Sequence, residues 1–104
     1  MKVETADTFY DDIGGRPPQD QIRILKRVGK WTTAKESGSV PFGFRDHPLG
    51  ISDSQANRYG KLCSFVTVKG FVAIYSVQTE NGETVIRIIM HDKHDIAYSR
   101  VERI

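Results

Sequence analysis

The pattern of apolar and polar residues changes from a helical period in the first third of the chain to a strand period in its last third. Phe9 and Ile13 lie four residues apart, so they share one face of a short predicted helix. The side chain of Thr5 or Asp7 can cap that helix. Residues 2–4 precede it and can form a short edge strand.

A second, amphipathic helix is predicted over residues 18–32. Pro17 and Pro18 suit its first turn, where a missing backbone N–H has no cost. An apolar stripe at helical spacing predicts its buried side and places the tryptophan in the core: Ile22, Leu25, Val28 and Trp31. Basic residues lie largely off that stripe and give the helix a basic outer side: Arg23, Lys26, Arg27 and Lys30.

Three strands are predicted over residues 62–68, 71–79 and 84–90, which are rich in β-branched and aromatic side chains. Asn81-Gly82 separates the last two and predicts a hairpin with a type I′ turn, because that turn needs positive φ at both central residues. The nearly unbroken apolar run over 84–90 is typical of a central strand that is covered on both faces.

The remaining segments are less regular. Arg87 interrupts the last apolar strand, so we expect it to point toward an edge, a partner or a binding surface. Residues 95–103 can form a terminal helix or an added strand. Residues 33–60 predict a long irregular connection, since glycine, proline and serine recur without periodicity. His47 in this connection precedes a proline, which favours a turn residue over a catalytic group.

Length and composition favour a small single-domain protein without a membrane helix or an internal disulfide. A chain of 104 residues predicts one domain, residues 1–104, and no apolar run approaches the roughly 20 residues of a membrane helix. Cys63 is the one cysteine, so an internal disulfide is impossible and a reducing cytoplasm is the expected location. We expect Cys63 to be a buried apolar side chain. The N-terminus has no apolar segment typical of a secretory signal.

Positive charge gathers in one segment of a chain whose formal net charge is +2. Residues 16–35 contain a single acidic residue, Asp20, against these basic ones: Arg16, Arg23, Lys26, Arg27, Lys30 and Lys35. Such a segment is either a surface that faces phosphates or an ordinary solvated helix face.

Titratable residues gather directly after the last predicted strand: His91, Lys93, His94 and Tyr98. Histidine can move protons near neutral pH, and lysine can stabilise negative charge on a phosphorus centre. A phenol can transfer a proton or stack on a base. The set fits metal-free RNA cleavage, with an ordinary polar turn as the alternative. Nearby ligands are too few to predict a metal site, and no cofactor-binding motif is present.

Several motifs in this order resemble those of the RelE/ParE toxin superfamily of bacterial toxin–antitoxin systems. The similarity is carried by Gly70 to Tyr75, the apolar strand Val85 to Met90, and His91 to Tyr98. Upstream, 9–13 and 18–26 are similar to the helical hairpin of these toxins. His47-Pro48-Leu49 resembles their approach to the sheet.

The resemblance implies an α+β fold in which an N-terminal strand and a two-helix hairpin pack on a three- to four-stranded antiparallel sheet. It also implies a small cytoplasmic toxin with a cognate antitoxin as partner, acting either as a ribosome-associated mRNA endoribonuclease or as a gyrase inhibitor. For a ribonuclease we expect His91 or His94 as acid or base, Tyr98 as a stacking or proton-transfer group, and Lys93 with Lys61 as phosphate stabilisers. RNA or the ribosome is then a partner, a membrane is not, and the oligomeric state stays open.

Two departures from the family pattern affect this expectation. Val72 and Asp92 stand where ribonuclease members usually have arginine, although Lys93 takes the second position in a shifted alignment. Lys61, Lys69 and Arg87 can supply positive charge from nearby strands. The departures keep a second class open, a toxin or inactive relative that binds a partner without cutting RNA.

Overall fold

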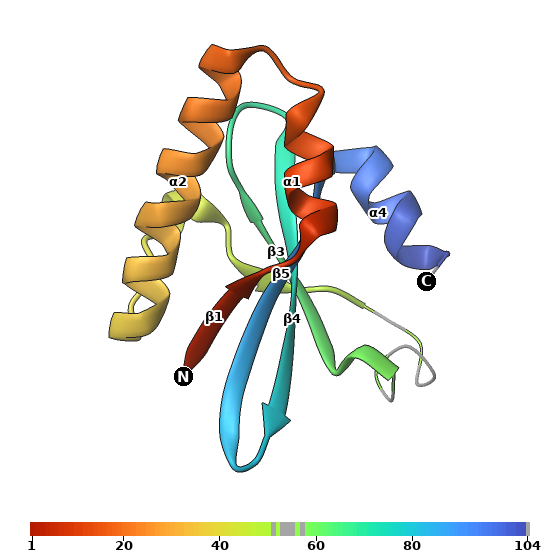
Figure 1. Ribbon diagram of the computed structural model, residues 1–104. Coiled ribbons are helices and arrows are strands. Elements are labelled where there is room, and N and C mark those ends of the chain that lie inside the picture. The colour runs from red at the N-terminus through yellow and green to blue at the C-terminus, as the bar shows by residue number, and fades with distance from the viewer. Residues whose placement is uncertain (51, 53–55, 57, 104) are drawn as a thin grey trace.

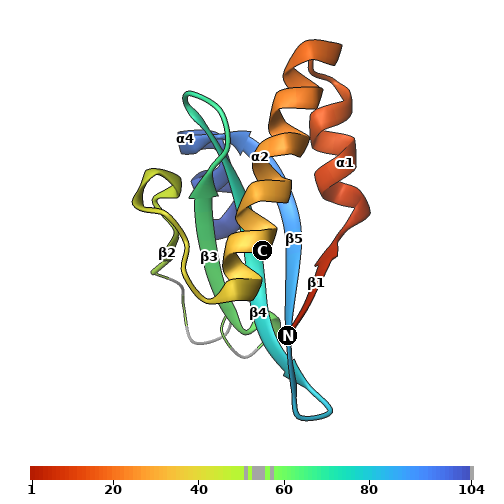
Figure 2. The same cartoon turned by 90° about the vertical axis from the view of Figure 1, so that its left-hand side faces the viewer.

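The computed structural model describes residues 1–50, 52, 56 and 58–103. Its strands are β1 (Lys2–Thr5), β2 (His47–Pro48), β3 (Lys61–Val66), β4 (Phe71–Glu80) and β5 (Glu83–Lys93). Its helices are α1 (Asp7–Gly14), α2 (Pro18–Ser37), the short 3-10 helix η1 (Phe42–Phe44) and α4 (His94–Glu102). The strands form one sheet in the order β1-β5-β4-β3-β2, which is followed from right to left in Figure 2.

Helices cover both faces of this sheet. The α1–α2 hairpin packs on one face, and α4 folds back onto the other (Figure 1). The first core cluster joins α1 and α2 to the sheet, and the second lies beneath α4. The predicted α+β fold is therefore confirmed, and the alternative for residues 95–103 is settled as a helix.

The β4–β5 hairpin turns where the sequence predicts. Asn81 has φ of 53° and Gly82 has φ of 77°, and Glu80 pairs with Glu83 across them. Both central residues thus have the positive φ of a type I′ turn.

The sheet is larger than predicted. It has five strands among the described residues rather than three or four: β1 is the edge strand expected over residues 2–4, and the short strand β2 is added at the other edge. β1 runs parallel to β5, so the sheet is not purely antiparallel. β5 continues to Lys93 because Ala73, Val72 and Phe71 pair with its last residues, and His91 therefore belongs to the strand rather than to the segment after it.

A β-bulge explains the unbroken apolar run of β5. Tyr75 pairs with Ile88 whereas Ile74 pairs with Met90, so Ile89 is an extra residue on this strand. Ile88 then lies in the core beneath α1 and α2, and Met90 lies in the core beneath α4. The strand thus has apolar side chains on both faces, as the run predicts.

The buried stripe of α2 differs from the prediction. Ile22 and Leu25 are 55% and 44% exposed, whereas Ile24, Val28 and Trp31 are buried. Residues three apart in an α-helix are separated by about 300° around the helix axis, which is about 60° short of a full turn. Over the three such steps from Ile22 to Trp31 the shortfall adds up to about 180°, so the two side chains lie on opposite sides of the helix.

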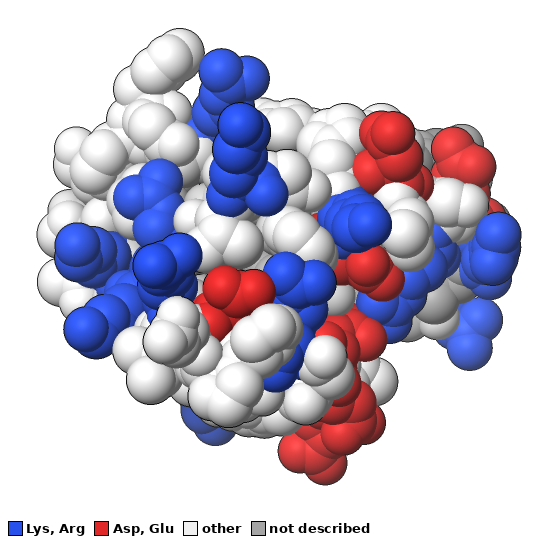
Figure 3. Space-filling view, turned by 90° about the horizontal axis from the view of Figure 1, so that it is seen from above, with Lys and Arg blue, Asp and Glu red and all other residues white. Residues whose placement is uncertain are grey.

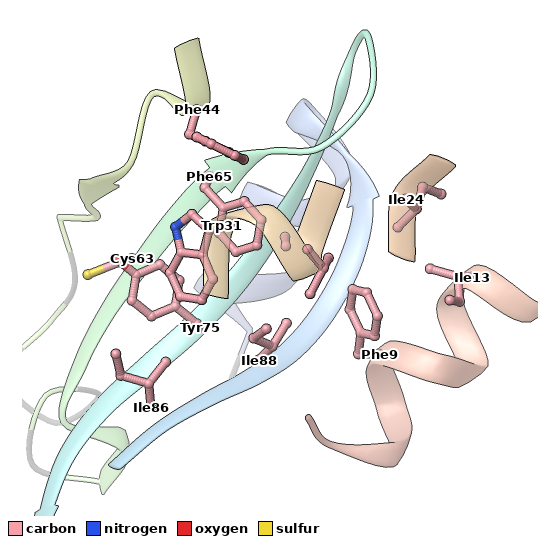
Figure 4. Packing of buried hydrophobic residues seen from close by; sticks show 12 residues of the cluster. Phe9, Ile13, Ile24, Trp31, Phe44, Cys63, Phe65, Tyr75, Ile86 and Ile88 are labelled. Carbon is pink, nitrogen blue, oxygen red and sulfur yellow. The ribbon is translucent and has the colours of Figure 1, made fainter. Parts of the chain in front are cut away.

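The core around Trp31 confirms its predicted burial. Its indole stacks on Phe65 with centroids 4.2 Å apart, and Tyr75 packs beside it (Figure 4). Cys63 is also buried, as expected. No helix of the described residues is both long and apolar enough to cross a membrane.

Candidate functional site

Asp46 anchors the chain immediately before β2. Its carboxylate accepts hydrogen bonds from the Trp31 indole at 2.9 Å and from the Tyr75 hydroxyl, and Lys35 Nζ lies 3.2 Å away. Burial and the Asp46 carboxylate raise the pKa of Tyr75, so its phenol stays protonated and donates. Asp46 is thus fixed on the α2 side of the sheet, and the next residue, His47, reaches α4.

His47 of the edge strand β2 contacts Tyr98 of α4 beside β3. His47 Nε2 lies 3.1 Å from the Tyr98 hydroxyl, and Ser64 Oγ lies 3.2 Å from the same oxygen. Ser64 is the cross-strand partner of His47, which explains why the two side chains converge on one point. Ser64 is buried, Tyr98 is half-buried and His47 is exposed, so the group opens to solvent at the imidazole.

The hydrogen bonds define the tautomer of a neutral His47. Its Nδ1 lies 2.6 Å from the Arg45 carbonyl oxygen, which can only accept, so Nδ1 carries the hydrogen. Nε2 then has a free lone pair and accepts from the Tyr98 hydroxyl. Ser64 in turn donates to the Tyr98 oxygen. The site therefore presents an imidazole nitrogen arranged as a base.

His94 completes this group of side chains. It is the first residue of α4, and its ring centroid lies 4.1 Å from that of Tyr98. Its Nδ1 lies 3.1 Å from the Asp95 carboxylate, and its side chain is 53% exposed. Two imidazoles and one phenol thus share one accessible surface.

His91 is placed elsewhere. It is 2% exposed and lies on the α1 face of the sheet, between the rings of Phe71 and Phe9. Its Nε2 lies 2.6 Å from Thr67 Oγ1. Burial lowers the pKa of His91 to about 4, against a partial opposing effect of Asp12 and Asp92. His91 is therefore a neutral core histidine near pH 7, and it does not join His94 and Tyr98.

Two of the expected cationic residues adjoin His94. Lys93 is exposed and directly precedes α4. Lys69 is exposed in the β3–β4 turn, where the next residue, Gly70, accepts the His94 backbone N–H at 3.0 Å. Both lysines thus lie next to the first turn of α4.

The other two expected strand cations do not adjoin His94. Lys61 lines a hollow on the α2 side of the sheet. Arg87 forms an ion pair with Glu4 of β1 at 2.8 Å, which helps to hold the parallel edge strand.

The basic residues of α2 lie on the opposite side of the molecule from α4. Arg23, Lys26 and Lys30 are exposed. Arg27 has a structural contact, because its guanidinium lies 3.7 Å from the Phe44 ring centroid and donates to the Gly43 carbonyl. Figure 3 shows lysine and arginine crowding the α2 side of the upper face, with acidic side chains mainly at the centre and opposite side.

The two positions that lack the family's arginine have other roles. Val72 is buried in the core beneath α4. Asp92 pairs with Arg100 at 3.2 Å, and Arg100 also pairs with Asp12 of α1. Within the described residues, no three or more histidine, cysteine, aspartate or glutamate side chains gather at a distance suited to a metal ion.

The sequence favours a turn residue at His47 and has no signal for Ser64, whereas the structure brings both side chains to Tyr98. His47 lies 51 residues from Tyr98 along the chain, so no local pattern pairs them. The His47-Pro48-Leu49 motif was the available signal. Ser64 carried none, since its role depends on the pairing of β2 with β3.

Solved structures resemble this fold over nearly its full length. YafQ from Escherichia coli BL21(DE3) matches with a TM-score of 0.64 and 14% identity, over 93% of this chain and 97% of that one. The DinJ–YafQ toxin–antitoxin complex of Escherichia coli gives a TM-score of 0.64 at 14% identity, over 93% and 96% of the two chains.

A YoeB/ParE toxin from Agrobacterium tumefaciens matches with a TM-score of 0.60 and 18% identity, over 90% of this chain and 99% of that one. Neither a protein-family model nor a curated protein sequence matches the chain. At these identities the likeness concerns the fold, and the chain has the RelE-like fold of these toxins.

Proposed function

We propose that this chain is the toxin of a bacterial toxin–antitoxin pair and that it cleaves mRNA on the ribosome without a metal ion. The observation that carries the proposal is the cluster of His47, His94 and Tyr98. The Tyr98 hydroxyl lies 3.1 Å from His47 Nε2, and the His94 ring packs on the Tyr98 ring. Two imidazoles on one exposed surface can supply the general base and the general acid for cleavage of RNA.

The fold supports the toxin assignment. Chains of the same fold include a toxin in complex with its antitoxin, and a YoeB/ParE toxin. The partner is accordingly a cognate antitoxin that covers the cluster when bound. A cytoplasmic location follows from this role.

The chemistry needs only the substrate's own 2′-hydroxyl as nucleophile. His47 Nε2 takes the 2′-OH proton after this hydroxyl replaces Tyr98 as the donor, and the 2′-oxygen attacks phosphorus. The P–O5′ bond breaks, and His94 in its protonated form gives a proton to the 5′-oxygen. The products are a 2′,3′-cyclic phosphate and a 5′-hydroxyl end. The Arg45 carbonyl accepts from Nδ1 of His47 throughout and stabilises the imidazolium.

Positive charge for the phosphorus centre comes from the start of α4. Lys93 and Lys69 are exposed beside His94, and an ammonium near a developing dianion lowers the barrier. Tyr98 positions the His47 imidazole and, once displaced, can donate its hydroxyl to a phosphate oxygen. Lys61, Arg87 and the basic residues of α2 have no part in this chemical step.

A toxin that binds its target without cutting RNA is the second candidate. The buried Val72 and the ion-paired Asp92 favour it, because neither position offers the free cation that ribonuclease relatives are expected to have. In that case the His47 cluster is a binding surface rather than a reaction centre.

A cleavage assay on purified ribosomes tests the proposal. His47→Gln and His94→Gln are each expected to slow cleavage by about 10²- to 10⁴-fold, the usual effect of losing a positioned acid or base. Tyr98→Phe keeps the ring packing on His94 and removes the hydroxyl, so a smaller loss is expected. RNA ends are mapped after a timed reaction.

His91→Gln is the matched control, because it changes a buried histidine outside the cluster and should leave cleavage near the wild-type rate at pH 7.5. Growth arrest in bacteria that persists in all three cluster variants, without new RNA ends, would favour the second candidate. Equal cleavage by wild type and His47→Gln would contradict the proposed mechanism.

A further inference from the structure

The hollow on the α2 side of the sheet, which Lys61 lines, also includes His47 in its lining. It has a volume of about 910 Å³, and it shares His47 with the proposed reaction centre. The side chains that matter most in its lining are Phe42, Arg45 and Lys61. Its size is within the range of sites that hold small organic groups, about 300–1,000 Å³.

Phe42 is held in solvent by a rigid turn. Its side chain is 92% exposed, the highest value among the exposed large apolar residues. The neighbouring Phe44 is 4% exposed and anchors η1 in the core, where its ring packs on Phe65. Arg27 lies over the Phe44 ring and donates to the Gly43 carbonyl at 3.2 Å. An aromatic ring on such a support presents a free π-face at little entropic cost.

The cations of this hollow are available to a ligand. Among the described residues, neither Arg45 nor Lys61 has an ion pair or a side-chain hydrogen bond. The third cation, Lys35, is already paired with Asp46. The hollow therefore combines one exposed aromatic face with two uncompensated positive charges. Arg45 precedes His47 by two residues, and Lys61 lies on β3, the strand that pairs with β2.

We infer that this hollow binds a nucleotide next to the one that is cut, with its base stacked on Phe42 and its phosphates at Arg45 and Lys61. The inference rests on the proposed function, because the hollow and the reaction centre share His47. Aromatic stacking with flanking cations is how proteins hold single-stranded nucleic acid without reading its sequence. A protein partner could also pack on the Phe42 ring, but it would not supply phosphate groups for Arg45 and Lys61 to bind.

Binding of an uncleavable oligonucleotide tests the inference apart from catalysis. The probe is a fluorescein-labelled, fully 2′-O-methylated single-stranded octanucleotide, and the readout is fluorescence anisotropy. Phe42→Ala is expected to weaken binding by about five- to a hundredfold, the usual effect of one lost base stack. Phe42→Trp should bind like wild type, and its exposed indole should be quenched by the bound bases.

Matched variants separate stacking from apolar contact and from charge. Phe42→Leu keeps apolar area without a π-face and should behave like Phe42→Ala, whereas Tyr10→Leu replaces an exposed aromatic on α1 and should have no effect. Arg45→Gln and Lys61→Gln should each flatten the salt dependence of binding by roughly one phosphate contact.

Two results would overturn the inference. One is that the wild type does not bind the octanucleotide, or that Phe42→Ala binds it as tightly as the wild type does. The other is a Phe42→Ala variant that loses affinity for its antitoxin and not for the octanucleotide, which would make the hollow a protein-docking site. Neither result depends on cleavage, so each can be distinguished from a failure of the proposed mechanism.

Discussion

Two histidines three residues apart in the sequence have opposite environments. His94 is exposed at the start of α4, whereas His91 is enclosed by Phe9, Phe71 and Thr67. β5 continues to Lys93, and successive side chains of a strand point to opposite faces of the sheet. His91 and His94 therefore lie on different sides of the sheet. Their chemistry therefore differs: His94 is accessible to a ligand, and His91 stays neutral in the core near pH 7.

The buried state of His91 makes stability depend on pH. The pKa of His91 falls from an ordinary value near 6.5 to about 4 in the folded chain, so between these values the unfolded chain binds more protons. The stabilising effect of a neutral His91 is fully present above pH 6.5 and is lost as the pH falls toward 4. The loss is on the order of 3 kcal/mol of unfolding free energy.

Urea unfolding at several pH values between 4 and 7.5 measures this effect. His91→Gln retains a hydrogen-bonding group for Thr67 but does not titrate, so its stability should decline less than that of wild type across the window. His94→Gln, which changes the exposed histidine, serves as the control and should keep the wild-type slope. A wild-type slope in His91→Gln would mean that His91 is not the group responsible.

At the scale of elements, the path of the chain before β2 determines where His47 lies. Asp46 binds Trp31 of α2 and Tyr75 of β4, so one carboxylate ties a helix and a central strand to the edge strand. Lys35 adds a third contact from the end of α2. The position of the His47 imidazole thus depends on the Asp46 side chain, which points to the α2 side of the sheet.

Asp46→Ala should therefore affect both stability and activity. Removing the carboxylate leaves the Trp31 N–H and the Tyr75 hydroxyl without their acceptor, which should lower the unfolding free energy by about 1–3 kcal/mol. Asp46→Asn keeps one acceptor and should lose less. Cleavage should drop in Asp46→Ala at a temperature where circular dichroism shows a folded protein. Full activity in that folded variant would contradict a positioning role for Asp46.

At the scale of the molecule, the sequence predicted those features that depend only on residues close together in the chain. The Asn81-Gly82 turn needs only two residues that accept positive φ, and Trp31 belongs to the core because a large indole on a helix needs burial. The parallel edge strand β1 and the bulge at Ile89 depend on pairing between distant segments. The contact between His47 and Tyr98 joins β2 to α4, so it follows from the finished sheet and not from either segment alone.

The chemical nature of the RNA ends distinguishes attack by the substrate's 2′-hydroxyl from hydrolysis by water. Wild-type protein, ribosomes and a defined mRNA are incubated, and the ends of the products are identified by mass spectrometry and by their reactivity toward kinase and phosphatase. A reaction through the 2′-hydroxyl with His47 and His94 predicts a 5′-hydroxyl on one product and a 2′,3′-cyclic phosphate, or its 3′-phosphate hydrolysis product, on the other. An mRNA with a 2′-deoxynucleotide before the scissile phosphate should stay intact at that site. Products with a 5′-phosphate and a 3′-hydroxyl, or cleavage of the deoxy substrate, would contradict the account.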